Sequence, residues 1–347
     1  MPNVLSITKA VIQPFPGHEL LEKYGPLLKV GLDKAFMRGA NTPIQGQKFF
    51  SESTEMKGYK KYQAKTGVGL MRQSRDNEPV PKTEGGLGFD YELSTLNYRL
   101  GISTERELLE KNLYGQFGKE QRDLADSSKR TLELMFADVF NRAHGGITYA
   151  TAAIGNGLSQ FICEDGCYLI SKDRPNPIGT AGTWSNRMPD VAWTAGGNND
   201  AVMANLIRDA KLMFKRYKND RGDLSPMTLK RVIVSPALED TIHRVTKTEK
   251  VYSGDAAVEA QKFSENAVNT ISGTPYEVYD WLSDGLIFFE GQGENELELL
   301  WRVRPGTMVY TDGNPDMLHQ RIRMALGMGC ARPATWIGCV TTGTDNI

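Results

Sequence analysis

The stretch 119–143, KEQRDLADSSKRTLELMFADVFNRA, is the most informative segment of the chain. Its apolar residues recur one and two helical turns apart, and they are Leu132, Met135, Phe136, Val139, Phe140 and Ala143. Charged side chains such as Lys129 and Glu133 occupy the other side, so the stretch predicts a long amphipathic helix. At 1.5 Å per residue this helix would be a rod of about 37 Å. The sequence His144-Gly145-Gly146 is a typical helix end.

Two different kinds of sequence precede this helix. Pro and Gly interrupt residues 1–48 every few positions, which predicts a weakly structured N-terminal arm. Residues 49–101 are polar and Gly-rich, and the alternation of apolar and polar residues from Phe89 to Ser94 predicts a strand. We therefore expect a long two-stranded excursion with a charged tip that includes Arg72, Arg75, Asp76, Glu78 and Lys82. A lone hairpin is marginal in water, so another copy of the chain should support it.

Helices and loops are expected over residues 102–198. Thr104 and Glu107 form a capping-box pattern, which predicts a short helix before the long one. Residues 146–198 are rich in loop-forming residues.

A compact α/β unit is expected over residues 199–285. A helix should run over 199–217, a strand over 229–235, and a second helix should begin at Ser235-Pro236. Residues 286–347 alternate or are continuously apolar, which predicts closing strands. The predicted fold class is therefore α+β.

Composition excludes several classes of protein. The chain has 347 residues with 40% hydrophobic and 24% charged residues, as in ordinary folded proteins. The formal net charge is -1 and no Lys/Arg run is present, which argues against a general nucleic-acid binder. No signal peptide or membrane-spanning segment is recognisable, so we expect folding in the cytoplasm without membrane attachment.

The sequence offers little chemistry. Its histidines, His18, His144, His243 and His319, lie in different predicted elements, and no phosphate loop or nucleophile elbow is present. The cysteines are Cys163, Cys167, Cys330 and Cys339, whose spacing favours reduced thiols over a structural metal site. The clusters at Gly85 and Gly327 lack the strand–turn–helix context of a dinucleotide site. We expect no enzyme activity, cofactor or metal.

Two stretches resemble a known family. The sequence 165–186, DGCYLISKDRPNPIGTAGTWSN, is similar to a stretch common in Mu-like major head subunits, with Ile170 where that pattern has Phe and Arg174 where it has His. The sequence 320–333, QRIRMALGMGCARP, is similar to the closing strand of such subunits. The order of arm, hairpin, long helix, α/β unit and closing strands also resembles the major capsid proteins of tailed double-stranded DNA phages, which have the Hong Kong-97-type fold.

The resemblance implies a division of the chain. It implies an N-terminal arm (1–48), an extended β-hairpin loop (49–101), a peripheral domain with a spine helix at 119–143 (102–198), an axial domain (199–285) and return strands of both domains (286–347). The charged tip, together with Arg174, Arg321 and Arg323, would then be the intersubunit contacts.

The resemblance also implies a function. The chain would assemble with itself into hexamers and pentamers of an icosahedral phage head in the host cytoplasm, and would enclose double-stranded DNA without sequence-specific binding. A separate scaffolding protein, a portal and a decoration protein would be its partners in the virion. Two alternatives stay open: an encapsulin-like nanocompartment shell and, from another class, a soluble α/β enzyme.

Overall fold

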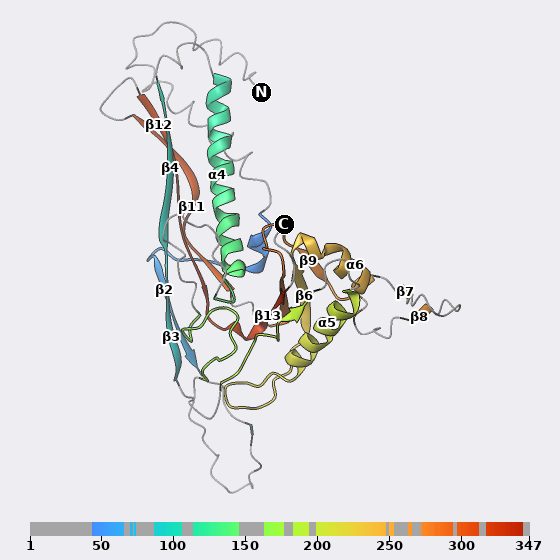
Figure 1. Cartoon of the computed structure of the whole chain (residues 1–347). Coiled ribbons are helices and arrows are strands. Elements are labelled where there is room, and N and C mark those ends of the chain that lie inside the picture. Colours follow the sequence, from blue (N-terminus) through green and yellow to red (C-terminus); the bar gives the residue numbers. More distant parts are fainter. Residues whose placement is uncertain are drawn as a thin grey trace.

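The computed structural model describes residues 44–65, 70–71, 73, 87–105, 114–145, 163–176, 183–193, 199–247, 250–252, 263–265, 271, 273–293, 297–311 and 317–342. These residues form two lobes that meet at the C-terminal end of the longest helix (Figure 1). We call them the long lobe and the compact lobe. The predicted arm before residue 44 and the predicted tip of the hairpin lie outside the described residues.

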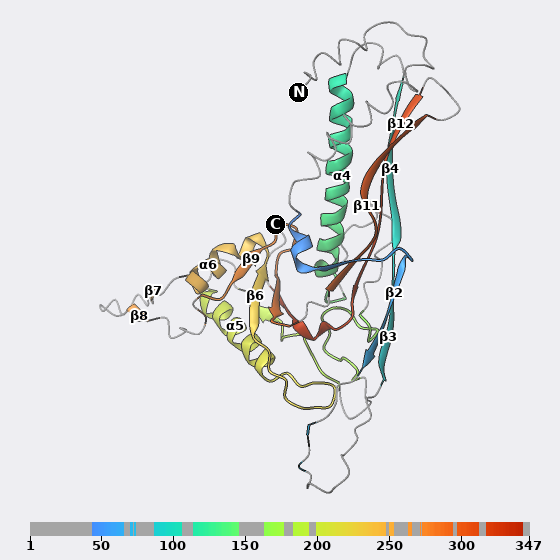
Figure 2. The same cartoon turned by 180° about the vertical axis from the view of Figure 1, so that it is seen from behind.

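The long lobe consists of one helix and one sheet. Helix α4 (Tyr114–Asn141) lies along one face of a four-stranded sheet, and the same arrangement is visible from behind (Figure 2). The strand order is β1-β11-β12-β4, with β1 parallel to β11 and the other pairs antiparallel. The strands are β1 (Ser51–Thr54), β11 (Leu297–Thr311), β12 (Met317–Cys330) and β4 (Leu96–Glu105).

The long helix predicted from the apolar pattern is confirmed. It begins at Tyr114, earlier than the predicted Lys119, and ends at Asn141. Gly145 adopts a left-handed conformation (φ 77°) just beyond the helix, where glycine costs little. Leu124 and Ala125 pack on Ile322 of β12 near the outer end of the lobe, so the helix covers the sheet along much of its length.

The prediction that a short helix begins at Thr104 is wrong. Thr104 belongs to β4, where it pairs with Leu318 of β12. Pairing with β12 therefore prevails over the local capping-box pattern, because a capping box stabilises a helix by only about 1 kcal/mol. Residues 106–113 lie outside the described part of the chain.

The predicted two-stranded excursion is confirmed at its base. Strands β2 (Tyr59–Lys65) and β3 (Leu87–Ser94) are antiparallel, with Tyr62 opposite Tyr91. Only Thr95 separates β3 from β4, and its N–H and hydroxyl both donate to the carbonyl of Gly58, at 2.9 and 3.0 Å. Strand β3 of the hairpin and strand β4 at the edge of the sheet are thus one nearly continuous extended segment.

Gly327 lies within a strand, where glycine is otherwise unfavourable. It occupies the middle of β12, opposite Leu300. A side chain there would collide with the backbone carbonyl of Ser94, where the hairpin joins the sheet. Gly327 therefore permits the close approach of the hairpin base to β12.

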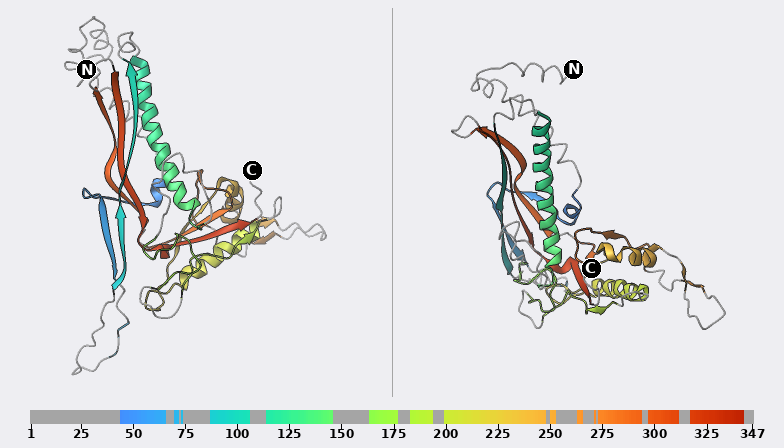
Figure 3. Two further views of the ribbon diagram at one scale, coloured as in Figure 1. Left: turned by 60° about the vertical axis from the view of Figure 1, so that its left-hand side comes forward. Right: turned by 45° about the horizontal axis from the view of Figure 1, so that its top comes forward.

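The compact lobe is a five-stranded sheet with two helices on one face. Its strand order is β5-β13-β10-β6-β9. The strands are β5 (Val191–Ala192), β13 (Trp336–Thr342), β10 (Leu286–Gly291), β6 (Leu229–Val234) and β9 (Tyr276–Val278). The helices are α5 (Asp200–Lys215) and α6 (Glu239–Lys247), visible in the left view of Figure 3. A two-stranded extension, β7 (Lys250–Tyr252) and β8 (Phe263–Glu265), projects beyond α6.

Most sequence predictions for the compact lobe are confirmed. The helix expected at 199–217, the strand expected at 229–235 and the buried run at Leu286 correspond to α5, β6 and β10. Pro236 opens a short 3-10 helix (Pro236–Leu238) that leads into α6. Ser235 is the N-cap residue of this 3-10 helix, as the sequence predicted, although its side chain makes no capping hydrogen bond.

One aromatic cluster joins the two lobes. Phe140 of α4, in the long lobe, lies with its ring centroid 5.4 Å from those of Phe288 and Trp336 in the compact lobe's sheet and of Phe49 in the 3-10 helix Gly46–Phe49. Each of these four side chains is fully buried. The two lobes therefore share one core, and ring contacts of this kind stabilise it beyond the area buried.

The end of the predicted arm belongs to this core. The 3-10 helix Gly46–Phe49 packs on α4, and the buried carboxylate of Glu133 accepts the N–H groups of Gln45 and Gly46. The hydroxyl of Tyr279 donates to the same carboxylate at 3.1 Å. Any free arm must therefore end before Gln45, several residues earlier than the sequence predicted.

Candidate assembly surfaces

In the stretch 165–186, the described residues 165–176 and 183–186 surround the buried side chain of Arg174. Its Nη1 donates to Oδ2 of Asp165 at 2.6 Å, its Nε to Oδ1 of Asn186 at 3.0 Å, and its Nη2 to the carbonyl of Leu169 at 2.7 Å. The guanidinium also lies 5.4 Å from the ring centroid of Trp184. Arg174 is 0% exposed, so these donors are used within its own chain.

Asn186 connects this network to the C-terminal strand. Its Nδ2 donates to the carbonyls of Leu169 and Trp336 at 2.8 and 2.9 Å. The N–H of Gly338 donates in turn to the carbonyl of Asn186 at 3.1 Å. We call Asp165, Arg174 and Asn186 the arginine clamp, because together they fasten the loop to β13. The structure thus places Arg174 inside the subunit rather than on the predicted contact surface.

Glu164 lies beside the arginine clamp and is half-buried. Burial raises the pKa of its carboxyl to about 7, while the nearby Arg332 opposes this shift and Asp165 adds to it. A carboxyl with this pKa changes charge near neutral pH. The charge of Glu164, at the edge of the loop that carries the arginine clamp, therefore depends on pH.

Arg321 and Arg323 lie on the face of the long lobe's sheet that points away from α4. Ile102 and Ile322 face α4, because both pack with Leu124, and side chains alternate along a strand. The residues that alternate with these along each strand therefore point away from α4, and we call their side of the sheet the outer face. It comprises Asn97, Arg99, Gly101 and Ser103 of β4, His319, Arg321 and Arg323 of β12, and Gly306, Met308 and Tyr310 of β11.

The outer face is basic. Arg99 lies directly opposite Arg323 in the β4–β12 ladder. Arg321 lies over the ring of Tyr310, 5.0 Å from its centroid, and Tyr310 stacks on His319. Across the rows 97–103, 306–310 and 319–323 there is no Asp or Glu. Like charges directly opposite each other destabilise a sheet, so this arrangement favours a site for an anionic group from outside the subunit.

The predicted charged tip of the hairpin cannot be placed. Arg72, Arg75, Asp76, Glu78 and Lys82 lie outside the described residues. The described base of the hairpin exposes large apolar side chains, with Leu87 68% and Tyr59 45% exposed. Exposed apolar residues on a projecting ribbon are typical of a contact surface.

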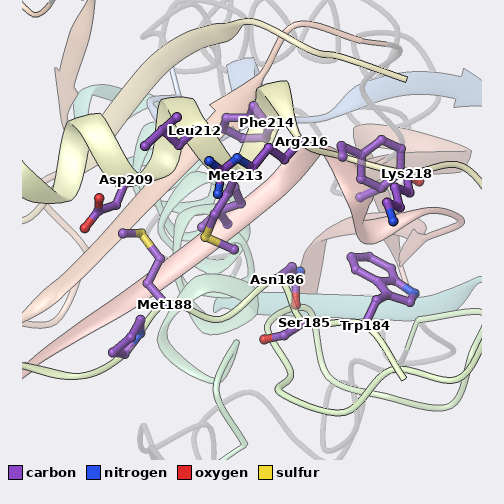
Figure 4. A pocket seen from close by; sticks show the side chains of 14 residues that line it. Trp184, Ser185, Asn186, Met188, Asp209, Leu212, Met213, Phe214, Arg216 and Lys218 are labelled. Atoms are coloured by element: carbon purple, nitrogen blue, oxygen red, sulfur yellow. The ribbon is translucent and has the colours of Figure 1, made fainter. Parts of the chain in front are cut away.

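A second candidate surface is a groove in the compact lobe. It has a volume of about 530 Å³ and lies between α5 and the loop after the arginine clamp. Figure 4 shows Trp184 and Met188 on one side and Met213 of α5 on the other, with Asp209 and Lys218 at the two ends. The mainly apolar lining could hold apolar side chains of another chain.

Histidines, cysteines and acidic residues are dispersed among the described residues. The described part of the chain contains no group of three or more His, Cys, Asp or Glu residues that could hold a metal ion. His144 packs on Phe288, and burial lowers its pKa to about 4, so it is neutral at pH 7. The four cysteines are all free thiols. Among the described helices, none is long and apolar enough to cross a membrane.

Several residues of these surfaces were missed in the sequence. Arg99 was not singled out, although the alternation Asn97, Arg99, Gly101, Ser103 is the pattern of a strand with one polar face. This strand pattern was missed because a helix was expected to begin at Thr104. Asp165 and Asn186 were quoted only as part of a motif, and no local signal shows that both bind one arginine.

Comparisons with known proteins support the fold. No family model and no curated protein sequence matches the chain. Among solved structures, it is similar to the chain in "Asymmetric unit of bacteriophage PhiM1 mature capsid", with a TM-score of 0.52, 9% identity, and coverage of 88% of this chain and 89% of that one. It is also similar to the chain in "Capsid of Ralstonia phage GP4", with a TM-score of 0.50, 11% identity, and coverage of 86% and 89%.

These likenesses define the class of fold. Both cover nearly the whole of each chain, so they concern the order and arrangement of both lobes and not one small motif. The protein has the mixed helix-and-sheet fold of these phage capsid chains. At such low identity the likeness concerns the fold alone.

Proposed function

We propose that this chain is a major capsid protein of a tailed double-stranded DNA phage. In this role it assembles with itself into the hexamers and pentamers of an icosahedral head. The observation that carries the proposal is the likeness to the PhiM1 capsid chain, because it covers 88% of this chain and 89% of that one and is therefore not a match of one small motif. The role is structural rather than catalytic.

The parts of the Hong Kong-97-type fold can be assigned on this basis. The long lobe corresponds to the peripheral domain, with α4 as its spine helix, and the compact lobe to the axial domain. Strands β2 and β3 are the base of the extended loop. The return strands β10 and β13 close the sheet of the compact lobe, while β11 and β12 build that of the long lobe.

This shape suits assembly into a thin shell. The long lobe and the hairpin extend away from the shared core (Figure 3), which gives one subunit reach over several neighbours. The outer face with Arg321 and Arg323 and the hairpin with its charged tip are the proposed contact surfaces. We further propose a separate scaffolding protein, a portal and a decoration protein as partners, and enclosure of double-stranded DNA without sequence-specific binding.

Assembly of the purified chain tests the proposal. We expect the recombinant protein, alone or with its scaffolding protein, to form rings, sheets or closed shells visible by negative-stain microscopy and by size-exclusion chromatography. A monomer that stays small under every assembly condition would contradict it. Particles purified from infected cells should contain nuclease-protected double-stranded DNA, whereas an encapsulin-like shell would contain protein cargo.

A further inference from the structure

Strand β4 is an unprotected edge of the long lobe's sheet. It pairs with β12 without interruption from Leu96 to Glu105, and no described strand lies along its other side. The strand contains no proline, and its pairing has no bulge. Proline, bulges and inward-pointing charges are the devices that normally protect a sheet edge, and β4 lacks all three. The outward N–H and C=O groups of β4 therefore have no strand partner among the described residues.

Apolar side chains accompany this edge. Leu96 and Leu100 point to the side of the sheet that α4 covers, yet they are 42% and 46% exposed. A cleft of about 230 Å³ lies between β4 and α4, with Leu100 and Met324 on the sheet side and Thr131 on the helix side. The side chains of one added strand would cover these leucines and fill this cleft.

The charge beside the edge indicates what the added strand carries. Arg99 of β4 lies opposite Arg323, whose Nη2 donates to Oδ1 of Asn97 at 3.3 Å. The Nε of Arg323 is buried and has no acceptor in the described part of the protein. A carboxylate on a strand added next to Arg99 would be directly opposite that arginine and would offset the repulsion between the two guanidinium groups.

We propose that the free edge of β4 is a strand-addition site for an extended, carboxylate-bearing segment of a second copy of this chain. With a net charge of -1, the arginines gathered on the outer face are balanced by acidic residues elsewhere on the same chain, such as the exposed Asp90 of β3. A second copy therefore carries the complementary charge. The inference rests on the proposed function, because it assigns to β4 one of the contacts that build the shell.

A pair of leucine variants tests the site. Leu100→Lys places an inward-pointing charge at the edge of β4, which should block strand addition while leaving the subunit folded. Leu224→Lys is the matched control, because Leu224 is also an exposed leucine, at 64%, and it lines neither the cleft beside β4 nor the groove of the compact lobe. We expect Leu100→Lys to slow assembly at least tenfold in light scattering, and the control to assemble like wild type. Equal assembly by both variants, with equal thermal unfolding temperatures of the free subunits, would overturn the proposal.

Hydrogen exchange distinguishes strand addition from contact through side chains alone. In the free subunit, the outward-facing amides of residues 96–105 should exchange rapidly, and in wild-type shells about half of the amides in this strand should become protected, since alternate amides face the edge. Shells in which the exchange of this peptide is unchanged overturn the inference but leave the proposed function intact. A wild-type chain that never assembles overturns both.

Discussion

The arginine clamp and the outer face of the sheet use the same side chain in opposite ways. In the clamp, Arg174 is fully buried and surrounded by a carboxylate, an amide oxygen and backbone carbonyls of its own chain. On the outer face, Arg99 and Arg323 are opposite each other without a carboxylate in the surrounding rows. An arginine paired with a carboxylate of its own chain fixes the subunit, whereas arginines without such a carboxylate can pair with one from a neighbour.

The largest expected effect is the loss of the clamp itself. Arg174→Ala leaves Asp165, whose side chain is 5% exposed, as a buried charge without its ion-pair partner. We expect the free energy of unfolding to fall by about 3–5 kcal/mol, measured by urea denaturation of the unassembled subunit. Arg321→Ala on the outer face is the control and should cost about 1 kcal/mol or less, because it loses mainly the contact with Tyr310. Similar losses for both variants would remove the contrast between the two regions.

A smaller effect is expected when the clamp loses its amide. Asn186→Ala leaves the Nε of Arg174 and the N–H of Ser171 without their shared acceptor, and it removes the amide donor to the carbonyl of Trp336. The expected loss of unfolding free energy is about 1–3 kcal/mol. The neighbouring exposed Ser185→Ala provides the comparison and should change stability very little. If the two alanine variants unfold alike, Asn186 does not fasten the loop to β13.

The pH dependence of the clamp loop can be measured separately. The pKa of Glu164 is raised to about 7 in the folded protein, so the stability that it contributes is fully present below pH 4.5 and is lost as the pH rises through 7. Glu164→Gln removes this dependence and should raise the unfolding free energy at pH 8 by about 1 kcal/mol, a value reduced for partial exposure. Thermal unfolding at pH 5 and pH 8 measures it. A variant with the same pH profile as wild type would contradict the assignment.

The smallest effect on stability is expected on the outer face. Arg99→Gln removes the repulsion across the β4–β12 pair and should stabilise the free subunit by about 0.2–1 kcal/mol. The same variant should assemble more slowly than wild type, because it removes the charge proposed to meet a carboxylate. Denaturation curves and light scattering on one preparation measure both. A variant that is less stable and assembles normally would place Arg99 among the structural arginines.

The sequence predicted correctly those elements whose apolar residues recur with a strong periodicity. The predictions failed for residues whose structure depends on contacts with residues distant in the chain. Helix α4, helix α5 and strand β10 follow from their apolar patterns alone, because each pattern reports directly which face is buried. Thr104 belongs to a strand because it pairs with Leu318. Gly327 is needed because the backbone of Ser94 approaches it closely. Neither contact leaves a local signal.

The candidate surfaces were predicted less completely than the fold. Arg321 and Arg323 were found because they alternate with apolar residues in a recognisable strand. Arg174 was expected to be an intersubunit contact from the family resemblance, and the sequence does not show that Asp165 and Asn186 enclose it. The pairing of Arg99 with Arg323 required the register of β4 against β12, which is a property of the folded sheet.

The nearly continuous course of β3 and β4 has a mechanical consequence. A pull on the hairpin passes through Thr95 directly into β4 and acts along the axis of that strand. Its hydrogen bonds to β12 are then loaded in shear, so the ladder from Leu96 to Glu105 must yield together rather than open one bond at a time. A subunit held by its hairpin would therefore resist tension in the plane of a shell far better than peeling away from it.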